Sequence, residues 1–134
     1  MIPLEQQVTT LAISKRLKEL GVKQESLFYS DKHGDRALYR YTYEQIMPVY
    51  ISAFTVAEIG EILPENIRAN RGNKKKSIRG VDFEFYQQGK HSIGYSHREY
   101  DSEEDLFDPI EITTEADARG KMLIYLLENN FIKP

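Results

Sequence analysis

The segment that most restricts how this chain can fold is its last helical stretch, from Thr114 to about Asn129. It contains the run MLIYLL, which puts apolar side chains on nearly every side of a helix. A helix of this kind must be covered on more than one side. We therefore expect it either to lie between a sheet and another helix or to place its outer side against a second copy of the chain.

The second alternative predicts a homodimer, because small soluble domains rarely leave a large apolar helix face exposed and two-fold dimers are the commonest oligomers. The side chains expected at that interface are Met122, Ile124, Tyr125 and Leu126. On the same helix we expect a buried stripe through Ala116, Gly120, Leu123 and Leu127. Gly120 has no side chain, so it should allow close approach of a second backbone.

Three helices carry recognisable start and stop signals. The first is expected from Leu11 to Leu20, with Thr10 as its N-cap and Gly21 closing it. The second begins at Thr55, which forms a T-x-x-E capping box with Glu58. Its buried stripe is expected to contain Val56, Ile59, Ile62 and Leu63, and Pro64 ends it. The third is the C-terminal helix, capped by Thr114 with Asp117 as a capping-box partner.

Two neighbouring segments, 81–85 and 91–97, show the alternation of half-buried strands. Val81, Phe83 and Phe85 alternate with acidic residues, and His91, Ile93, Tyr95 and His97 alternate with serine or glycine. Directly opposite residues of a hairpin share a face, and a three-residue loop ending in glycine is a common connection. A loop ending at Gly89 with positive φ gives the register. The expected pairs are Phe85–His91, Phe83–Ile93 and Val81–Tyr95.

Further strands are expected earlier in the chain. Ser26–Ser30 and Ala37–Tyr43 are predicted to form a second hairpin, followed by a short edge strand at Val49–Ile51. Another short strand is expected at Ile110–Ile112. The strands are expected in hairpins, and single strands do not alternate with helices as they do in α/β proteins. This order of elements predicts an α+β fold. We expect one domain, residues 1–134, with a small antiparallel sheet built from hairpins and about three packed helices.

Composition excludes several classes of protein. The chain has no cysteine, so disulfides and thiolate metal sites are excluded. The net charge of −3 argues against general attraction to nucleic acid. The longest apolar run is far shorter than a bilayer span, and no signal peptide is present at the start. We expect a cytoplasmic protein with no membrane contact.

No catalytic motif is present, so we predict a non-enzymatic protein with no catalytic residues, no cofactor and no metal. Asp31, His33 and Asp35 alternate, but they lie in a predicted turn, where such residues are ordinary. His91 and His97 lie about 20 Å apart along one strand, which is too far to share an ion. The carboxylates near residues 101–108 lack the spacing of a calcium loop.

Two segments of opposite charge stand out. The first, about 66–80, is a predicted basic loop, and Glu65–Gly80 contains six basic residues against one carboxylate. The second, about 99–108, is a predicted acidic loop, and Arg98–Glu111 contains seven carboxylates against one arginine. The basic loop has three interpretations: it contacts nucleic acid phosphates, it is merely solvated, or it lies against the acidic segment of the same chain or of a neighbour. The candidate phosphate-contacting residues are Arg68, Arg71, Lys74, Lys75, Lys76 and Arg79.

The stretches LEQQVTTLAISKRLKELGVKQESLFY, YISAFTVAEIGEILP and TEADARGKMLIYLLENNFI together resemble a group of small, uncharacterised phage and prophage proteins, notably of Bacteroidetes. The resemblance covers roughly half of the chain and implies a mobile-element protein that acts inside a bacterial host cell. It brings no known activity. From the sequence we expect a binding or regulatory module that acts by protein–protein contact; the alternative is a nucleic-acid-binding accessory protein that uses the basic loop.

Overall fold

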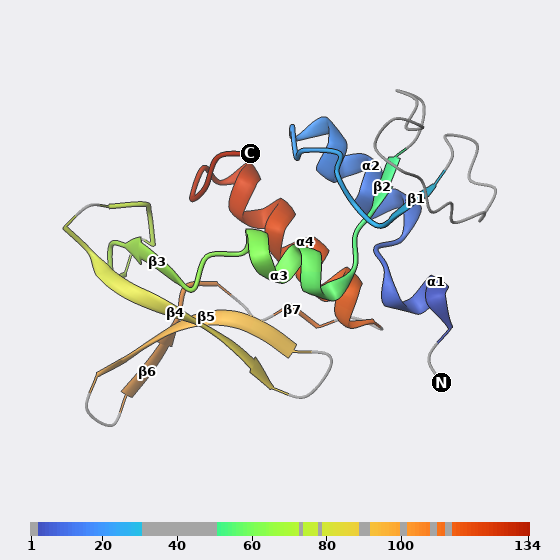
Figure 1. Ribbon diagram of the computed structural model, residues 1–134. Coiled ribbons are helices and arrows are strands. Elements are labelled where there is room, and N and C mark those ends of the chain that lie inside the picture. Colours follow the sequence, from blue (N-terminus) through green and yellow to red (C-terminus); the bar gives the residue numbers. More distant parts are fainter. Residues whose placement is uncertain are drawn as a thin grey trace.

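The computed structural model describes residues 3–30, 51–72, 74–77, 79–88, 92–99, 102–107, 110–111 and 114–134. These residues form an α+β fold, as predicted (Figure 1). The helices are α1 (Leu4–Gln7), α2 (Leu11–Glu19), α3 (Val56–Ile62) and α4 (Glu115–Glu128). The strands are β1 (Phe28–Ser30), β2 (Ile51–Ala53), β3 (Asn66–Ala69), β4 (Val81–Gln88), β5 (Ser92–Glu99), β6 (Ser102–Asp105) and β7 (Ile110–Glu111).

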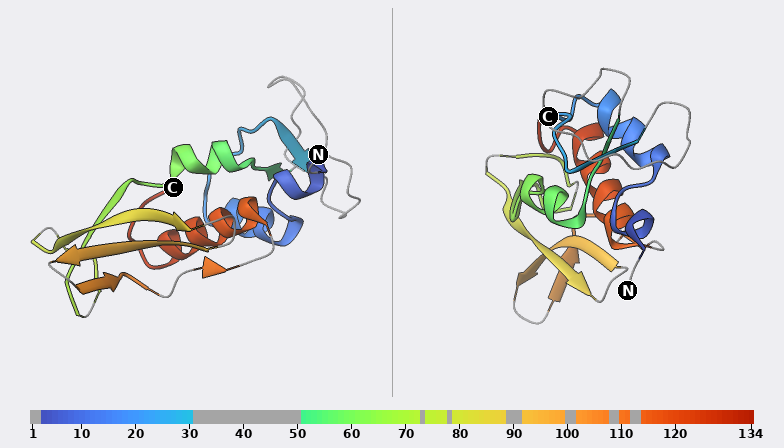
Figure 2. Two further views of the ribbon diagram at one scale, coloured as in Figure 1. Left: turned by 90° about the horizontal axis from the view of Figure 1, so that it is seen from below. Right: turned by 45° about the vertical axis from the view of Figure 1, so that its right-hand side comes forward.

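The described strands form two antiparallel sheets. The smaller one pairs β1 with β2, and the larger has the order β3-β4-β5-β6, with β7 pairing β5 alongside β6. Figure 1 shows α3 and α4 on one side of the larger sheet, and Figure 2 shows β4 and β5 projecting beyond the helices. The larger sheet therefore has one face against the helices and one face turned away from them.

Helix α4 lies at the centre of the fold. It contacts α1, α2 and α3, and on its other side it packs on β5 and β7. Met122, Leu123 and Leu126 are all fully buried by the chain itself. The first of the two alternatives for this helix is therefore correct, because it lies between the sheet and other helices.

The predicted self-association surface on α4 is reduced for the same reason, and the homodimer itself stays a prediction. Met122 and Leu126 are covered by the chain, so neither can contact a second copy. Ile124 and Tyr125 are half-buried and pack against the core. The sequence indicated correctly how apolar the helix is, but it did not reveal that α2, α3 and the sheet together cover it.

Gly120 is where α2 and α4 approach most closely. A Cβ built on Gly120 would lie 2.6 Å from Cγ2 of Ile13 and 3.0 Å from Cγ2 of Thr9. The sequence predicted close approach of a second backbone here, whereas the atoms that approach Gly120 belong to the side chains of Ile13 and Thr9. The stripe through Ala116, Leu123 and Leu127 is buried, as expected.

The helix N-termini follow the prediction in part. The Thr114 hydroxyl accepts a hydrogen bond from the backbone amide of Asp117 at 3.2 Å, so Thr114 is the N-cap of α4. The Asp117 carboxylate does not complete a capping box; it accepts from the backbone amide of Thr10 at 2.8 Å. The Thr10 hydroxyl makes no capping bond, contrary to expectation. Asp117 therefore joins the start of α4 to the start of α2.

The capping box of α3 is confirmed. Thr55 accepts from the amide of Glu58 at 3.2 Å, and Glu58 accepts from the amide of Thr55 at 3.0 Å. The predicted stripe is wrong at Ile62, which is 41% exposed, whereas Ile59 is fully buried.

The predicted register of the β4–β5 hairpin is wrong. Phe85 lies opposite Tyr95, not His91, and Gln88 lies opposite Ser92. Both registers place the same side chains on the same face, so the hydrophobic pattern does not distinguish them. The glycine at position 89 guided the prediction, but β4 continues to Gln88. Residues 89–91 and the expected positive φ of Gly89 lie outside the described residues.

In the N-terminal part, β1 pairs with β2, and Phe28 lies opposite Ala53. The proposed partner strand at 37–43, and the cluster at 31–35, lie outside the described residues. Of the short strand expected at 49–51, Ile51 alone lies among the described residues; it belongs to β2, whose three residues are all buried. Among the described strands β2 pairs only with β1, so it is an edge strand of its sheet, and it also contacts α2.

The contact at Gly120 leads to a test of α2–α4 packing. Alanine in place of glycine inside a helix ordinarily adds about 1 kcal/mol of stability. We expect Gly120→Ala to lower the free energy of unfolding by about 1 kcal/mol or more instead, because the new methyl meets the stiff branched side chain of Ile13. Denaturant unfolding measures the change.

The control is the same substitution in an Ile13→Ala background, where Cγ2 is absent. There Gly120→Ala should cost clearly less than in the wild type. A stabilising effect of Gly120→Ala in the wild-type background would contradict the described helix contact.

Candidate functional site

The two faces of the five-stranded sheet differ sharply in character. Odd-numbered residues of β4 and β5 face the helices, and Phe83, Ile93 and Tyr95 among them are fully buried. Tyr95 donates a hydrogen bond from its hydroxyl to the carbonyl of Pro64 at 2.6 Å, and burial raises its pKa. This inner face belongs to the core.

The opposite face, which we call the outer face, carries the side chains of alternate residues. In each pair of neighbouring strands, directly opposite residues share a face. The described side chains of the outer face are those of Asn66, Arg68, Asp82, Glu84, Tyr86, Gln88, Ser92, Ser96, Glu103 and Asp105, with Gly94 among them. No helix among the described residues covers this face (Figure 1).

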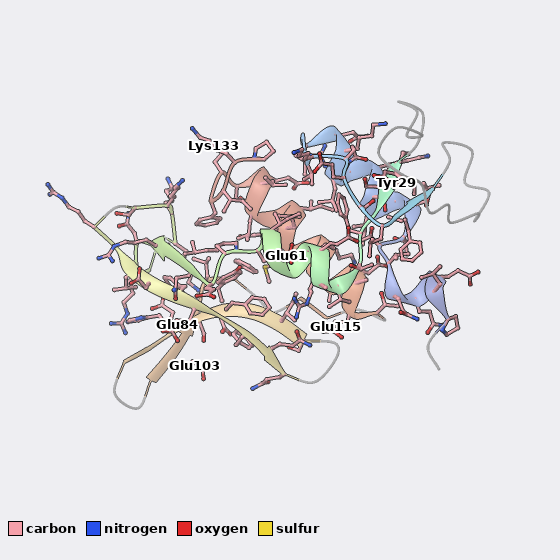
Figure 3. All side chains as sticks on the ribbon, in the orientation of Figure 1. Tyr29, Glu61, Glu84, Glu103, Glu115 and Lys133 are labelled. Carbon is pink, nitrogen blue, oxygen red and sulfur yellow. The ribbon has the colours of Figure 1, made fainter. Side chains whose placement is uncertain are left out.

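The described side chains of the outer face are predominantly acidic. They include four carboxylates, Asp82, Glu84, Glu103 and Asp105, against the single guanidinium of Arg68. Glu84 and Glu103 are exposed, and Figure 3 shows them on the part of the sheet remote from α3 and α4. Such a face repels phosphates and attracts cations.

Tyr86 lies on the outer face where β4 and β5 pair with each other, beyond the paired residues of β3 and β6. In the register it lies opposite Gly94, and a Cβ built on Gly94 would meet the ring at 2.7–2.9 Å. Glycine therefore lets the ring rest directly on the neighbouring strand. Burial and the nearby carboxylate of Asp105, which also makes a hydrogen bond with the hydroxyl, raise the pKa of Tyr86 to about 12. The hydroxyl end of the ring is thus held against β5 and Asp105.

The basic segment is more ordered than predicted. Asn66–Ala69 is β3 and not a loop, and Arg68 pairs with Asp82 across the strands at 3.3 Å. Beyond β3 the chain turns back, since Ala69 bridges to Lys76 and the amide of Asn70 donates to the carbonyl of Lys75 at 2.8 Å. The expected loop at 66–80 is therefore a strand followed by a hydrogen-bonded turn.

The acidic segment is also partly a strand, because Ser102–Asp105 forms β6. Glu104 accepts from Arg71 Nε at 2.9 Å and from the amide of Gly72 at 3.3 Å. Burial alone would raise the pKa of Glu104, but these hydrogen bonds and the charge of Arg71 outweigh it, so its pKa is lowered. The interpretation in which the basic and acidic segments of one chain meet is thus supported at Arg71.

The remaining candidate phosphate contacts lie near the turn. Lys75, Lys76 and Arg79 are exposed, and Lys74 has positive φ of 52°. Lys74 adds a favourable charge interaction to Glu104. The structure thus places these four at one end of the sheet, whereas Arg68 and Arg71 are paired with carboxylates of the same chain.

A polar cluster that the sequence did not indicate joins the sheet to α4. Gln87 donates from its amide to Glu115 at 3.0 Å, and Arg119 donates to the Gln87 carbonyl oxygen at 3.0 Å. The Arg119 guanidinium also lies 5.7 Å from the ring centre of Phe85. The predicted register placed Gln87 in a turn, which hid this cluster. These contacts connect β4 to the first turns of α4, so the cluster has a structural role.

The described residues do not bring together three histidine or carboxylate side chains able to hold a metal ion. His97 packs at 5.9 Å from Phe83 and lies 3.1 Å from the carbonyl oxygen of Asp82 through Nδ1. His33 and His91 lie outside the described residues. Among the described helices, none has the length and apolar character needed to cross a membrane.

Comparison with known protein families, with curated proteins and with solved structures finds no match to this chain. A function for the chain must therefore be inferred from its own geometry.

The pair of Arg71 and Glu104 can be tested by a double-mutant cycle with Arg71→Gln and Glu104→Gln. We expect a coupling energy of about 0.5 kcal/mol at pH 7, since Arg71 is 48% exposed and Glu104 is 25% exposed. The folded state lowers the Glu104 pKa, so the contribution is full above about pH 4.3 and is lost as pH falls through the lowered value.

Denaturant unfolding of the four proteins at pH 7 and at pH 2.5 measures this coupling. A cycle of Arg68→Gln with Glu104→Gln is the control, because Arg68 pairs with Asp82 instead and its coupling to Glu104 should be near zero. Equal coupling in both cycles, or coupling that persists at pH 2.5, would contradict a specific pair.

Proposed function

We propose that the protein is a non-enzymatic binding module that acts by contact with another protein, and that the outer face is its contact surface. The observation that carries the proposal is the outer face itself, which no described helix covers and on which the ring of Tyr86 rests against Gly94. Tyrosine is enriched at protein interfaces because its ring packs while its hydroxyl stays hydrogen-bonded.

The acidic character of the same face favours protein over nucleic acid as the partner. Sheet faces that bind nucleic acid combine aromatic side chains with positive charge, because phosphates must be neutralised. Here Asp105 makes a hydrogen bond with the Tyr86 hydroxyl and the charge of Glu103 also acts on it, while Glu84 lies two residues away on the same face of β4. In keeping with the resemblance of the helical segments, the proposed setting is the cytoplasm of a bacterial cell that carries a phage or prophage.

The test is affinity capture from such a host with three immobilised proteins: the wild type, Tyr86→Ala and Glu61→Ala. Glu61 is an exposed residue of α3 on the helical side, so it is the matched control. We expect a protein that the wild type and Glu61→Ala retain after nuclease treatment and that Tyr86→Ala retains at least fivefold less. Retention that nuclease abolishes, or that Tyr86→Ala leaves unchanged, would refute the proposal.

A second candidate function, nucleic-acid binding, is favoured by the position of Lys74, Lys75, Lys76 and Arg79 at one end of the sheet. We rank it lower, because Arg68 and Arg71 pair with carboxylates and cannot both keep those pairs and contact phosphates. The wild type should therefore show no shift of random duplex DNA at physiological salt.

A gel-shift titration across a range of salt concentrations measures this. If binding is seen, the change of Lys74, Lys75 and Lys76 together to glutamine should reduce the slope of log K against log salt by about 2.7, at roughly 0.9 for each lost phosphate contact. Salt-sensitive binding of that kind would place the nucleic-acid function first. The change of Lys15, Lys18 and Lys23 to glutamine is the control of equal charge.

A further inference from the structure

The outer face offers an aromatic ring and carboxylates within reach of one another. Tyr86 and Glu84 lie two residues apart on the same strand and the same face, about 7 Å apart along β4. Asp105 makes a hydrogen bond with the Tyr86 hydroxyl, and the charge of Glu103 also acts on that group. A single long side chain laid over the ring can therefore reach these carboxylates.

The Tyr86 ring is a platform with one side against the sheet. Gly94 lies beneath it, and any other residue at that position would displace the ring. Tyr86 is half-buried, so part of the ring remains exposed to solvent. A cation placed over the face of an aromatic ring is attracted by the electrons of that ring, and surrounding carboxylates add to the attraction.

Arg68 and Asp82 lie on the outer face at its β3 side, next to the group of carboxylates near Tyr86. They pair with each other at 3.3 Å, so the carboxylate of Asp82 is already partly neutralised at the β3 side of the face. Glu84, Glu103 and Asp105 show no such pair with a cation among the described residues of the chain. Among the described side chains, the negative charge without such a pair therefore lies on the Tyr86 side, with Arg98 opposite Glu103 in the register. A net negative charge of this kind selects a cationic occupant.

We propose that the outer face binds a lysine- or arginine-rich segment of the partner protein, with a cationic side chain over the Tyr86 ring and Glu84, Glu103 and Asp105 as its counter-charges. This inference rests on the proposed function and assigns the chemical class of its partner. The occupant is a segment of a different protein, whose lysine or arginine side chains complement the charge of the face. Charge pairing gives such a contact a fast association rate and sensitivity to salt.

The test uses a fluorescein-labelled peptide of alternating arginine and serine, with an alternating glutamate and serine peptide for comparison, in anisotropy titrations at low and physiological salt. We expect the arginine peptide to bind and the glutamate peptide not to bind. Tyr86→Ala should weaken binding about 5- to 30-fold, and Tyr86→Phe, which keeps the ring, should stay within about threefold of the wild type.

The charge contribution is tested with two variants that each lose three carboxylates. One carries Glu84→Gln, Glu103→Gln and Asp105→Asn on the outer face. The other carries Glu5→Gln, Glu61→Gln and Glu65→Gln, all exposed positions away from the outer face. We expect the first to weaken binding at least tenfold and the second by less than threefold. Equal weakening by both would mean that net charge alone attracts the peptide, and would overturn the proposal.

A further variant separates an effect of unfolding from an effect of losing the aromatic ring. Tyr86→Leu keeps an apolar cover over Gly94 but removes the aromatic face, so it should fold and still bind the arginine peptide weakly. Thermal unfolding of each variant is measured alongside the titrations. If Tyr86→Leu has the wild-type melting temperature and wild-type affinity, the ring is not the binding element and the proposal fails.

Two further results separate this proposal from others. Sedimentation of the wild-type protein alone at low salt should show a monomer; salt-sensitive self-association lost in the outer-face variant would mean that a second copy is the occupant, which overturns the proposal. If the arginine peptide does not bind but capture from the host still depends on Tyr86, the partner is not cationic. In that case the proposed function stands and only this inference fails.

Discussion

The contact between α2 and α4 at Gly120 is the constraint on which the rest of the fold depends. Because Ile13 approaches the backbone of α4 there, the two helices pack closely, and Asp117 fixes their starts through the amide of Thr10. With one side of α4 occupied in this way, α3 and the sheet cover its remaining apolar surface. Because α4 and α3 lie against one face of the larger sheet, only the outer face of that sheet is left uncovered by the described helices.

The features predicted correctly from the sequence are those that local interactions determine. The N-cap of Thr55, the left-handed Gly21 and the N-cap of Thr114 depend on residues within one helical turn, so a short stretch of sequence contains all the information. The α+β class followed from the order of such elements. Ile62 was mispredicted because helix periodicity indicates which side is apolar but not how far the neighbouring elements extend.

Features that depend on distant partners were not predictable in the same way. Two registers of the β4–β5 hairpin bury the same side chains, and the choice between them depends on contacts such as that of Gln87 with Glu115 on α4. The candidate site inherited this error, because Tyr86 meets Gly94 only in the observed register. The alternation of acidic residues on β4 was visible, but by itself it indicated only a face in water.

The contact of the Tyr86 ring with Gly94 has a consequence for how the sequence of this protein can evolve. Substitutions at Glu84 or Glu103 alter the charge of the outer face without touching the buried side chains, so new preferences for partners can arise at little cost to folding. Gly94 is different, because any side chain there lifts the ring. We therefore expect the sequence to vary freely at the charged positions around the ring and to keep glycine at position 94. The partner that is recognised can then change while the support of the ring stays the same.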